Sequence, residues 1–308
     1  MDVCLVTAPT ISDFGDPEIT LDAYKPRGPQ LGILALAAAV RRYGHRPIVI
    51  DLDRIALDTL RAGGKDVSPD DLLNAFSEAL NSTQTPLFGF STICGSYPLT
   101  LRLTKRVAQN HPGAMIVLGG PQASVVDVAT MQRFDWIDAI VRGEADQSFP
   151  DLLDRLERNG EHVAAIRSDR NDLKGVTSRS PAGAVTRGPG ASLVSDLDDL
   201  PLPAFDLDPH IRLRGSVHLE IGRGCPYGCT FCSTNDFFRR RFRLKSANTM
   251  LAHMRQLHKQ YGVQAFSLVH DMFTVRRDDV VDFCMAILNS GEKYEWSCSA
   301  SPAIAVVV

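Results

Sequence analysis

The chain has 308 residues, of which 44% are hydrophobic and 22% are charged, as is typical of a globular protein of about two domains. Its formal net charge of −3 provides no basic field, so no nucleic-acid partner is indicated. The N-terminus lacks the basic start of a secretory signal, and the apolar run at 31–40 is too short to cross a bilayer, so no membrane association is expected.

Seven cysteines are present, and three of them lie within eight residues. The other four are scattered singly, mostly in apolar surroundings, where a thiol acts as a small buried hydrophobe: Cys4, Cys94, Cys284 and Cys298. An odd number without paired spacings does not suggest a disulfide framework. We therefore expect a reduced, cytoplasmic protein.

Strands and helices alternate five times in the first half of the chain. Strands are predicted at 2–7, 47–51, 86–92, 114–120 and 137–145. Helices are predicted at 31–44, 68–80, 98–110, around 122–132 and at 149–160, with Ser68 as the N-cap of the second. This alternation predicts an α/β domain over residues 1–160, with a Rossmann-like, doubly wound parallel sheet.

Small and polar residues follow three of these strands, at the edge where doubly wound sheets bind ligands. They are Ser91, Thr92, Gly119, Gly120, Gly143 and Glu144. A glycine in any one loop is explained by the turn alone, but three such loops at one edge favour a ligand. Neither a GxGxxG nor a GxxxxGK[ST] motif occurs, so a nicotinamide or nucleoside triphosphate has no motif support.

The second half is predicted to contain a connector and a smaller α/β region. Residues 161–212 are interpreted as a hairpin and a Pro-rich spacer. Residues 213–308 follow as a second domain, with strands at 216–222, 263–271 and 294–300 and helices at 247–262 and 277–291. The order β-α-β-α-β predicts the first units of a β/α barrel.

The segment GRGCPYGCTFC joins the first of these strands to the rest, with the spacing C-x3-C-x2-C. Structural zinc takes four ligands, so zinc would need a fourth from His218, His270 or Cys298. Three thiolates fit an iron–sulfur cluster better, because one iron then keeps an open position for a substrate. The glycines of the segment let its backbone wrap a bulky cofactor, and Phe231 can cover one face of a bound group.

GCPYGCTFC resembles the cluster motif of radical S-adenosylmethionine (SAM) enzymes, C-x3-C-x-aromatic-C. The resemblance implies that Cys225, Cys229 and Cys232 ligate a [4Fe–4S] cluster. The free iron would bind SAM, and an electron from an external flavodoxin- or ferredoxin-type reductant would cleave it to a 5′-deoxyadenosyl radical.

Two further features near the cluster motif are candidates for SAM binding. Asp271, at the end of the second strand, is the candidate that the family resemblance implies for the SAM ammonium group. The run FFRRRFRLKS includes Arg241 and Arg243, which would clamp the SAM carboxylate or an anionic substrate. The alternative is that this run is a solvated loop.

The first domain resembles the cobalamin-binding domain of B12-dependent radical SAM enzymes, through LGILALAAAVRRYGH, FGFST, IVLGGP and IVRGEAD in that order. The resemblance implies cobalamin over the sheet edge, near the six small and polar residues named above. The D-x-H-x-x-G motif that supplies a histidine to cobalt is absent. His45 is interpreted instead as a capping residue at a helix end.

The leading hypothesis is a B12-dependent radical SAM enzyme that transfers a methyl group to an unactivated carbon. The predicted barrel contains only two β/α units and a third strand, followed by the tail SPAIAVVV, so we interpret the chain as truncated within the barrel. Whether it is long enough for catalysis stays open. One alternative is a cobalamin-binding module with an inactive barrel, and another is a zinc-stabilised α/β binding protein.

Overall fold

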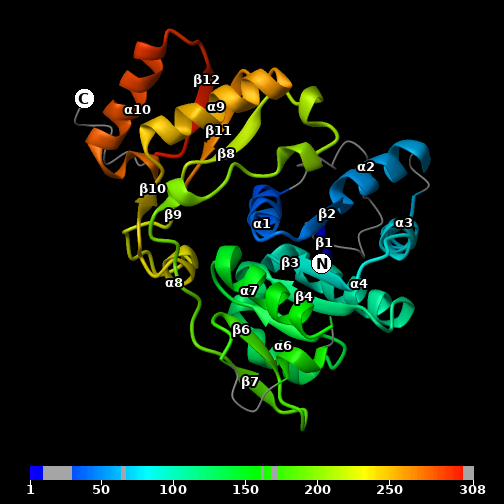
Figure 1. Ribbon diagram of the computed structural model, residues 1–308. Helices are drawn as coiled ribbons and strands as arrows, with labels where there is room; N and C mark the ends of the chain where they lie inside the picture. The colour runs from blue at the N-terminus through cyan, green and yellow to red at the C-terminus, as the bar shows by residue number, and fades with distance from the viewer. Residues whose placement is uncertain (10–29, 64–66, 161–162, 168–171, 301–308) are drawn as a thin grey trace. The chain divides into compact units, whose positions relative to one another are not determined.

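The computed structural model describes residues 1–9, 30–63, 67–160, 163–167 and 172–300 (Figure 1). By their contacts, the residues form two units, Met1–Ser192 and Leu193–Val308. The domain limits predicted from sequence, at 160 and 212, differ from this division and stay predictions. Most of the loop expected between Pro9 and Pro29, and the tail from 301, lie outside the described residues.

The first unit is built on a sheet with the strand order β2-β1-β3-β4-β5-β6-β7. Its first five strands are parallel: β1 (Asp2–Thr7), β2 (Arg46–Asp51), β3 (Leu87–Ser91), β4 (Met115–Gly119) and β5 (Ala139–Val141). The predicted doubly wound sheet is confirmed. Its order reverses between β1 and β3, and such switch points are where these sheets bind ligands.

Seven α-helices are described in this unit (Figure 1): α1 (Leu31–Arg42), α2 (Leu52–Gly63), α3 (Pro69–Asn81), α4 (Tyr97–Asn110), α5 (Gly120–Val125), α6 (Asp127–Arg133) and α7 (Ala145–Arg158). Helix α2 was not predicted, and the helical piece expected around 122–132 is two short helices. Ser68 caps α3 as predicted: its hydroxyl accepts from Asp71 N at 3.2 Å, and its own amide donates to the Asp71 carboxylate at 2.8 Å. The core includes Phe76, Phe88 and Phe90, each no more than 2% exposed.

An antiparallel hairpin, β6 (Val176–Arg179) and β7 (Val185–Arg187), extends the sheet beyond β5. A buried carboxylate fastens it. Asp127 lies 3.3 Å from Nε of Arg142 and 2.9 Å from Nε of Arg187, and the Thr177 hydroxyl donates to it at 2.5 Å. The hairpin that the sequence placed in the connector is therefore part of the first sheet.

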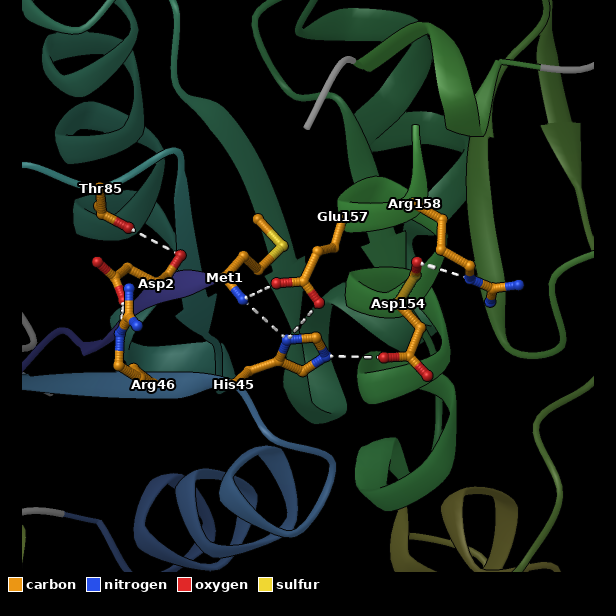
Figure 2. Close-up of polar contacts among 8 residues, drawn as sticks. All are labelled: Met1, Asp2, His45, Arg46, Thr85, Asp154, Glu157 and Arg158. Carbon is orange, nitrogen blue, oxygen red and sulfur yellow. Dashed lines mark hydrogen bonds and ion pairs between the residues drawn. The ribbon is translucent and has the colours of Figure 1, made fainter. Parts of the chain in front are cut away.

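His45 takes part in closing α1 only through its backbone, because its amide donates to the Val40 carbonyl at 3.3 Å. The C-cap residue of α1 is Tyr43, and the buried His45 ring makes other contacts (Figure 2). Nδ1 of His45 lies 3.1 Å from the terminal amine of Met1, and Nε2 lies 3.0 Å from the carboxylate of Asp154. The same amine donates to Glu157 at 2.6 Å, so this network ties β1 and the α1–β2 turn to α7.

The second unit contains a parallel sheet with the order β12-β11-β8, formed by β8 (Val217–Glu220), β11 (Ala265–Val269) and β12 (Glu295–Cys298). Helices α9 (Ala247–Tyr261) and α10 (Arg277–Ser290) connect its strands. Ser246 caps α9 by accepting from Thr249 N at 3.2 Å, as expected from the sequence. The β-α-β-α-β order is confirmed.

The remaining elements are short strands, one short helix and 3-10 turns. The short strands β9 (Gly222–Arg223) and β10 (Arg243–Leu244) pair antiparallel, and α8 (Thr234–Phe237) lies between them in the chain. The 3-10 turns are η2 (Cys94–Ser96), η3 (Val163–Ile166), η4 (Leu197–Asp199), η5 (Phe205–Leu207), η6 (Ile211–Leu213) and η7 (Phe273–Val275). No helix in the described ranges is both long and apolar enough to cross a membrane.

Candidate functional site

The three clustered cysteines lie in the loop that follows β9, here called the cysteine loop (Cys225–Cys232). Cys225 and Cys232 are half-buried and Cys229 is exposed, and none of the seven cysteines forms a disulfide. The amide of Cys232 donates to the carbonyl of Cys229 at 3.1 Å, so the loop turns between these two residues. Three accessible thiols thus occupy one short turn.

The donor set of the cysteine loop bears on the choice between a cluster and zinc. Zn–S bonds of about 2.3 Å bring the sulfurs of one tetrahedral zinc site within about 3.8 Å of one another. Among the described residues, only His45, Asp154 and Glu157 form a group of three with ligand atoms within 4.8 Å. The cysteines do not, either with one another or with His218, His270 or Cys298. Three soft thiolate donors in one loop fit a cluster in which each thiolate binds its own iron.

Two glycines of the preceding segment permit close packing against the chain around β10. A Cβ on Gly224, whose φ is +78°, would lie 2.2 Å from the carbonyl oxygen of Arg241. A Cβ on Gly222 would lie 2.5 Å from the His270 ring and 2.6 Å from the Arg243 carbonyl. The sequence suggested that these glycines make room for a cofactor, whereas in the structure their space is used by the protein's own chain.

A buried ion pair lies directly before the cysteine loop, and sequence reasoning missed it. Nε of Arg223 donates to Glu220 at 2.9 Å and Nη2 donates at 3.1 Å, a two-pronged contact with Arg223 only 8% exposed. The sequence pattern that could have predicted this ion pair is the i,i+3 spacing of the two charges at the end of a strand. Beside Gly222, burial lowers the pKa of His270, which favours the neutral ring.

Asp271 lies beside the far end of the cysteine loop. The Thr234 hydroxyl, two residues beyond Cys232, donates to Asp271 at 3.5 Å. Phe231 is 89% exposed, so its ring is accessible to a bound group. The structure therefore brings Asp271 near the cysteine loop, and the SAM-binding roles of these two residues stay predictions.

The two candidate arginines differ in their surroundings. Arg243 donates to the carbonyl of Val194 and stands over the Phe238 ring at 5.9 Å, so its guanidinium already has contacts inside its own unit. Arg241 is exposed, and its carbonyl accepts from Nε of Arg243 at 3.5 Å. Of the two, Arg241 has the more accessible side chain for an anion, and neither role is tested.

At the edge of the first unit's sheet, Thr92 fastens two loops together. Its hydroxyl donates to the Gly119 carbonyl at 2.7 Å and accepts from Ala123 N at 2.9 Å, while its amide donates to the same carbonyl at 2.8 Å. Gly120 has φ +89°, and a Cβ there would lie 2.5 Å from the Thr92 oxygen. Thr92 is fully buried, which makes it a support of the edge, whereas Ser91, Gly119 and Gly120 are half-buried.

The third loop joins this edge through Ser124. The amide of Gly143 donates to the Ser124 hydroxyl at 3.0 Å, and that hydroxyl donates to the Gly120 carbonyl at 2.7 Å. Glu144 precedes α7 and is only 4% exposed. Four of the six predicted residues thus belong to one hydrogen-bonded edge, and the other two, Ser91 and Glu144, are their direct neighbours in the chain. Three of these residues are glycines, which place no side chain at this edge.

These two regions define a class of protein: a ligand-binding doubly wound domain followed by a β/α region with a three-thiol cluster loop. The B12 binding domain family model matches residues 17–153, and the Radical SAM superfamily model matches residues 219–303. The chain therefore belongs to the radical SAM proteins that carry a B12-binding domain, and the resemblance expected from sequence is confirmed.

Known relatives agree with this assignment. An uncharacterized methyltransferase of Pyrococcus horikoshii is 26% identical over 280 residues, which are 89% of this chain and 55% of that protein. The anaerobic magnesium-protoporphyrin IX monomethyl ester cyclase of Rubrivivax gelatinosus is 29% identical over 61% of this chain and 33% of its own. The cobalamin-dependent SAM radical enzyme OxsB matches 96% of this chain and 38% of its own, with a TM-score of 0.70 and 19% identity. The chain thus spans about half the length of the first of these relatives.

Proposed function

We propose that the protein is a B12-dependent radical SAM enzyme that transfers a methyl group to an unactivated carbon. The single observation that carries this proposal is the cysteine loop, with three accessible thiols placed after the first strand of a β/α sheet. Parallel β/α folds carry their chemistry at the carboxyl ends of their strands. Since the chain spans 55% of its Pyrococcus relative, the activity of the whole protein is part of the proposal.

In this proposal, Cys225, Cys229 and Cys232 hold a [4Fe–4S] cluster and leave one iron open for SAM. When bound, the cluster provides the electron that cleaves SAM, and cobalamin carries the methyl group. Asp271 would orient the SAM ammonium group and Arg241 its carboxylate, while Phe231 would cover the bound ligand. Arg243, held by Val194 and Phe238, would position Arg241 through its hydrogen bond to the Arg241 carbonyl.

Cobalamin would lie on the edge formed by Ser91, Gly119 and Gly120 of the first unit, supported from below by Thr92. Gly143 and Glu144 would complete this surface. An external flavodoxin- or ferredoxin-type protein would deliver the electron. Seven cysteines without a disulfide suit a reducing cytoplasm, where we place the protein.

Methyl transfer is favoured over the ring formation named for the cyclase relatives, because the Pyrococcus methyltransferase matches 89% of this chain and the Rubrivivax cyclase matches 61%. The substrate is not part of the proposal. A cobalamin-binding module with an inactive barrel is the second candidate.

The test is anaerobic reconstitution of the full chain with iron, sulfide and cobalamin. The proposal predicts about four irons per chain, retained cobalamin and reductant-dependent formation of 5′-deoxyadenosine from SAM. Iron and cobalamin without 5′-deoxyadenosine would support the inactive module. Zinc in place of iron would contradict both candidates.

A further inference from the structure

A strained turn lies against the cysteine loop. The amide of Arg241 donates to the carbonyl of Phe238 at 2.9 Å and closes a β-turn whose central residues, Arg239 and Arg240, have φ of +52° and +55°. Positive φ at both central positions defines a type I′ turn, which strongly favours Asn and Gly. Within the described ranges, these two arginines are the only non-glycine residues with positive φ.

Holding two arginines in this conformation costs about 1–2 kcal/mol for each residue. Such strain persists only where neighbouring contacts hold the backbone in place. Here Phe238 packs edge-on against Phe237, with ring centroids 4.9 Å apart, and Arg243 stands over the Phe238 ring at 5.9 Å. Two glycines at these positions would form the same turn without the strain. The turn therefore does not itself require arginine, and a role for the arginine side chains must lie in their contacts.

The turn contacts the cysteine loop at two points. The Arg241 carbonyl occupies the place of a Gly224 Cβ, directly before Cys225. A Cβ on Gly228, directly before Cys229, would lie 3.4 Å from Cζ of Arg240 and 3.5 Å from both of its terminal nitrogens. These near-equal distances mean that the guanidinium plane faces Gly228. One strained turn therefore contacts the residues before two of the three thiols and places the Arg240 guanidinium against Gly228, the residue before the second thiol.

We propose that Arg240 is a positioning and charge-tuning residue that raises the midpoint potential of the cluster and slows its loss. The inference rests on the proposed function, because it requires the cluster. A reduced cluster is more negative than an oxidised one, so a fixed nearby cation favours the reduced form. An arginine remains charged at every working pH, and its plane packs on a glycine as an ammonium group cannot.

The structure offers a matched pair of variants. Arg240→Gly and Arg239→Gly each remove one cation, and each relieves one strained residue of the same turn. Only Arg240→Gly removes the guanidinium that faces Gly228. Arg240→Lys restores the charge without the planar contact, and Arg240→Gln retains a long neutral side chain if the glycine variant does not fold.

The experiment is a redox titration of the reconstituted full chain, followed by electron paramagnetic resonance (EPR), with iron release to a chelator as a second readout. Relative to the wild type, Arg240→Gly should lower the equilibrium constant for reduction on the order of tenfold, about 59 mV for one electron, and should speed iron release. Arg239→Gly should change both the midpoint potential and the rate of iron release clearly less. Arg240→Lys should have a midpoint potential close to that of the wild type but should release iron faster than the wild type.

Three results would distinguish the possible failures. Equal potentials and release rates for Arg240→Gly and the wild type would overturn the inference. Equal changes in Arg239→Gly and Arg240→Gly would also overturn it, because a general loss of charge would then explain them. Failure of the wild type itself to assemble a cluster would instead contradict the proposed function.

Discussion

The two units use their polar residues in opposite ways. In the first unit, His45, Thr92, Asp127 and Glu144 are at most 4% exposed, and the contacts of the first three join separate elements. In the second unit, the cysteine loop exposes Cys229 and leaves Phe231 89% exposed. The first unit thus presents a rigid edge built from small residues, whereas the second presents reactive groups to whatever binds there.

The helices show the same difference. Helix α7 of the first unit buries six residues, while Phe283 is the one buried residue of α10 in the second. Val281, Met285 and Leu288 of α10 are at least 40% exposed. Loss of a buried contact should therefore affect stability most in the first unit, and loss of a thiol should affect metal content most in the second.

The largest expected effect is a loss of iron that leaves the fold of the first unit unchanged. Cys229→Ala should reduce iron incorporation from about four per chain to near zero, because a cubane held by two thiolates is labile. Cobalamin retention by the first unit should be unchanged. The matched control is Cys94→Ala, which removes another exposed thiol outside the cysteine loop and should retain its iron. Iron analysis of both reconstituted variants measures this, and equal iron contents would contradict the site.

Asp127→Asn should have the largest effect on stability, about 3 kcal/mol, because it removes the buried counter-charge of Arg142, whose side chain is only 11% exposed. The control is Asp172→Asn, whose carboxylate pairs with Arg155 at 2.7 Å on the surface and should contribute less than about 1 kcal/mol. Urea unfolding of the apo protein compares the two variants. Similar losses of unfolding free energy in the two variants would mean that the Asp127–Arg142 pair does not stabilise the hairpin.

Gly120→Ala tests whether the sheet edge depends on close packing. Both Gly120 and Gly44 have positive φ, +89° and +88°, but only a Cβ at Gly120 meets another atom, the Thr92 oxygen at 2.5 Å. Gly44→Ala should cost about 1 kcal/mol from backbone strain alone. Gly120→Ala should cost more and should weaken cobalamin retention as well. Equal stability and equal retention in the two variants would remove this edge from the proposed site.

The smallest predicted effect is a pH dependence of the second unit. Burial, assisted by the nearby Lys245, lowers the pKa of His253 from 6.5 to about 4. Between these values the unfolded chain binds more protons than the folded one, so stability should fall as the pH drops from 6.5 towards 4. His253→Gln should flatten this dependence, whereas His218→Gln, at an exposed position, should not. The measurement is the urea midpoint of each variant at pH 7 and at pH 5. An equal fall in the midpoint between these pH values for both variants would contradict the prediction.

Patterns local in the sequence predicted the elements well. The caps at Ser68 and Ser246, the alternation of strands and helices and the cysteine spacing each depend on neighbouring residues, and they carried the fold class and the cluster motif. Helix α2 was missed although its hydrophobic residues recur at helical spacing, with Leu52, Ala56 and Leu60 buried.

Contacts between distant residues were not predictable in the same way. The partners of Asp127 lie 15, 50 and 60 positions away along the chain, and the ring of His45 meets Asp154 across 109 positions. The glycines before the cysteine loop looked like space for a cofactor because nothing local indicated that Arg241 would pack there. The left-handed Arg239–Arg240 turn also contradicts local preference, since Asn and Gly are favoured at such positions.

The central claim is that three thiolates leave one iron of the cluster open for SAM. The most direct measurement is the EPR spectrum of the reduced, reconstituted full chain before and after addition of SAM, without cobalamin or substrate. The account predicts that SAM changes the spectrum of the wild type, because its amino and carboxylate groups bind the open iron. A reduced [4Fe–4S] signal that saturating SAM leaves unchanged would contradict it.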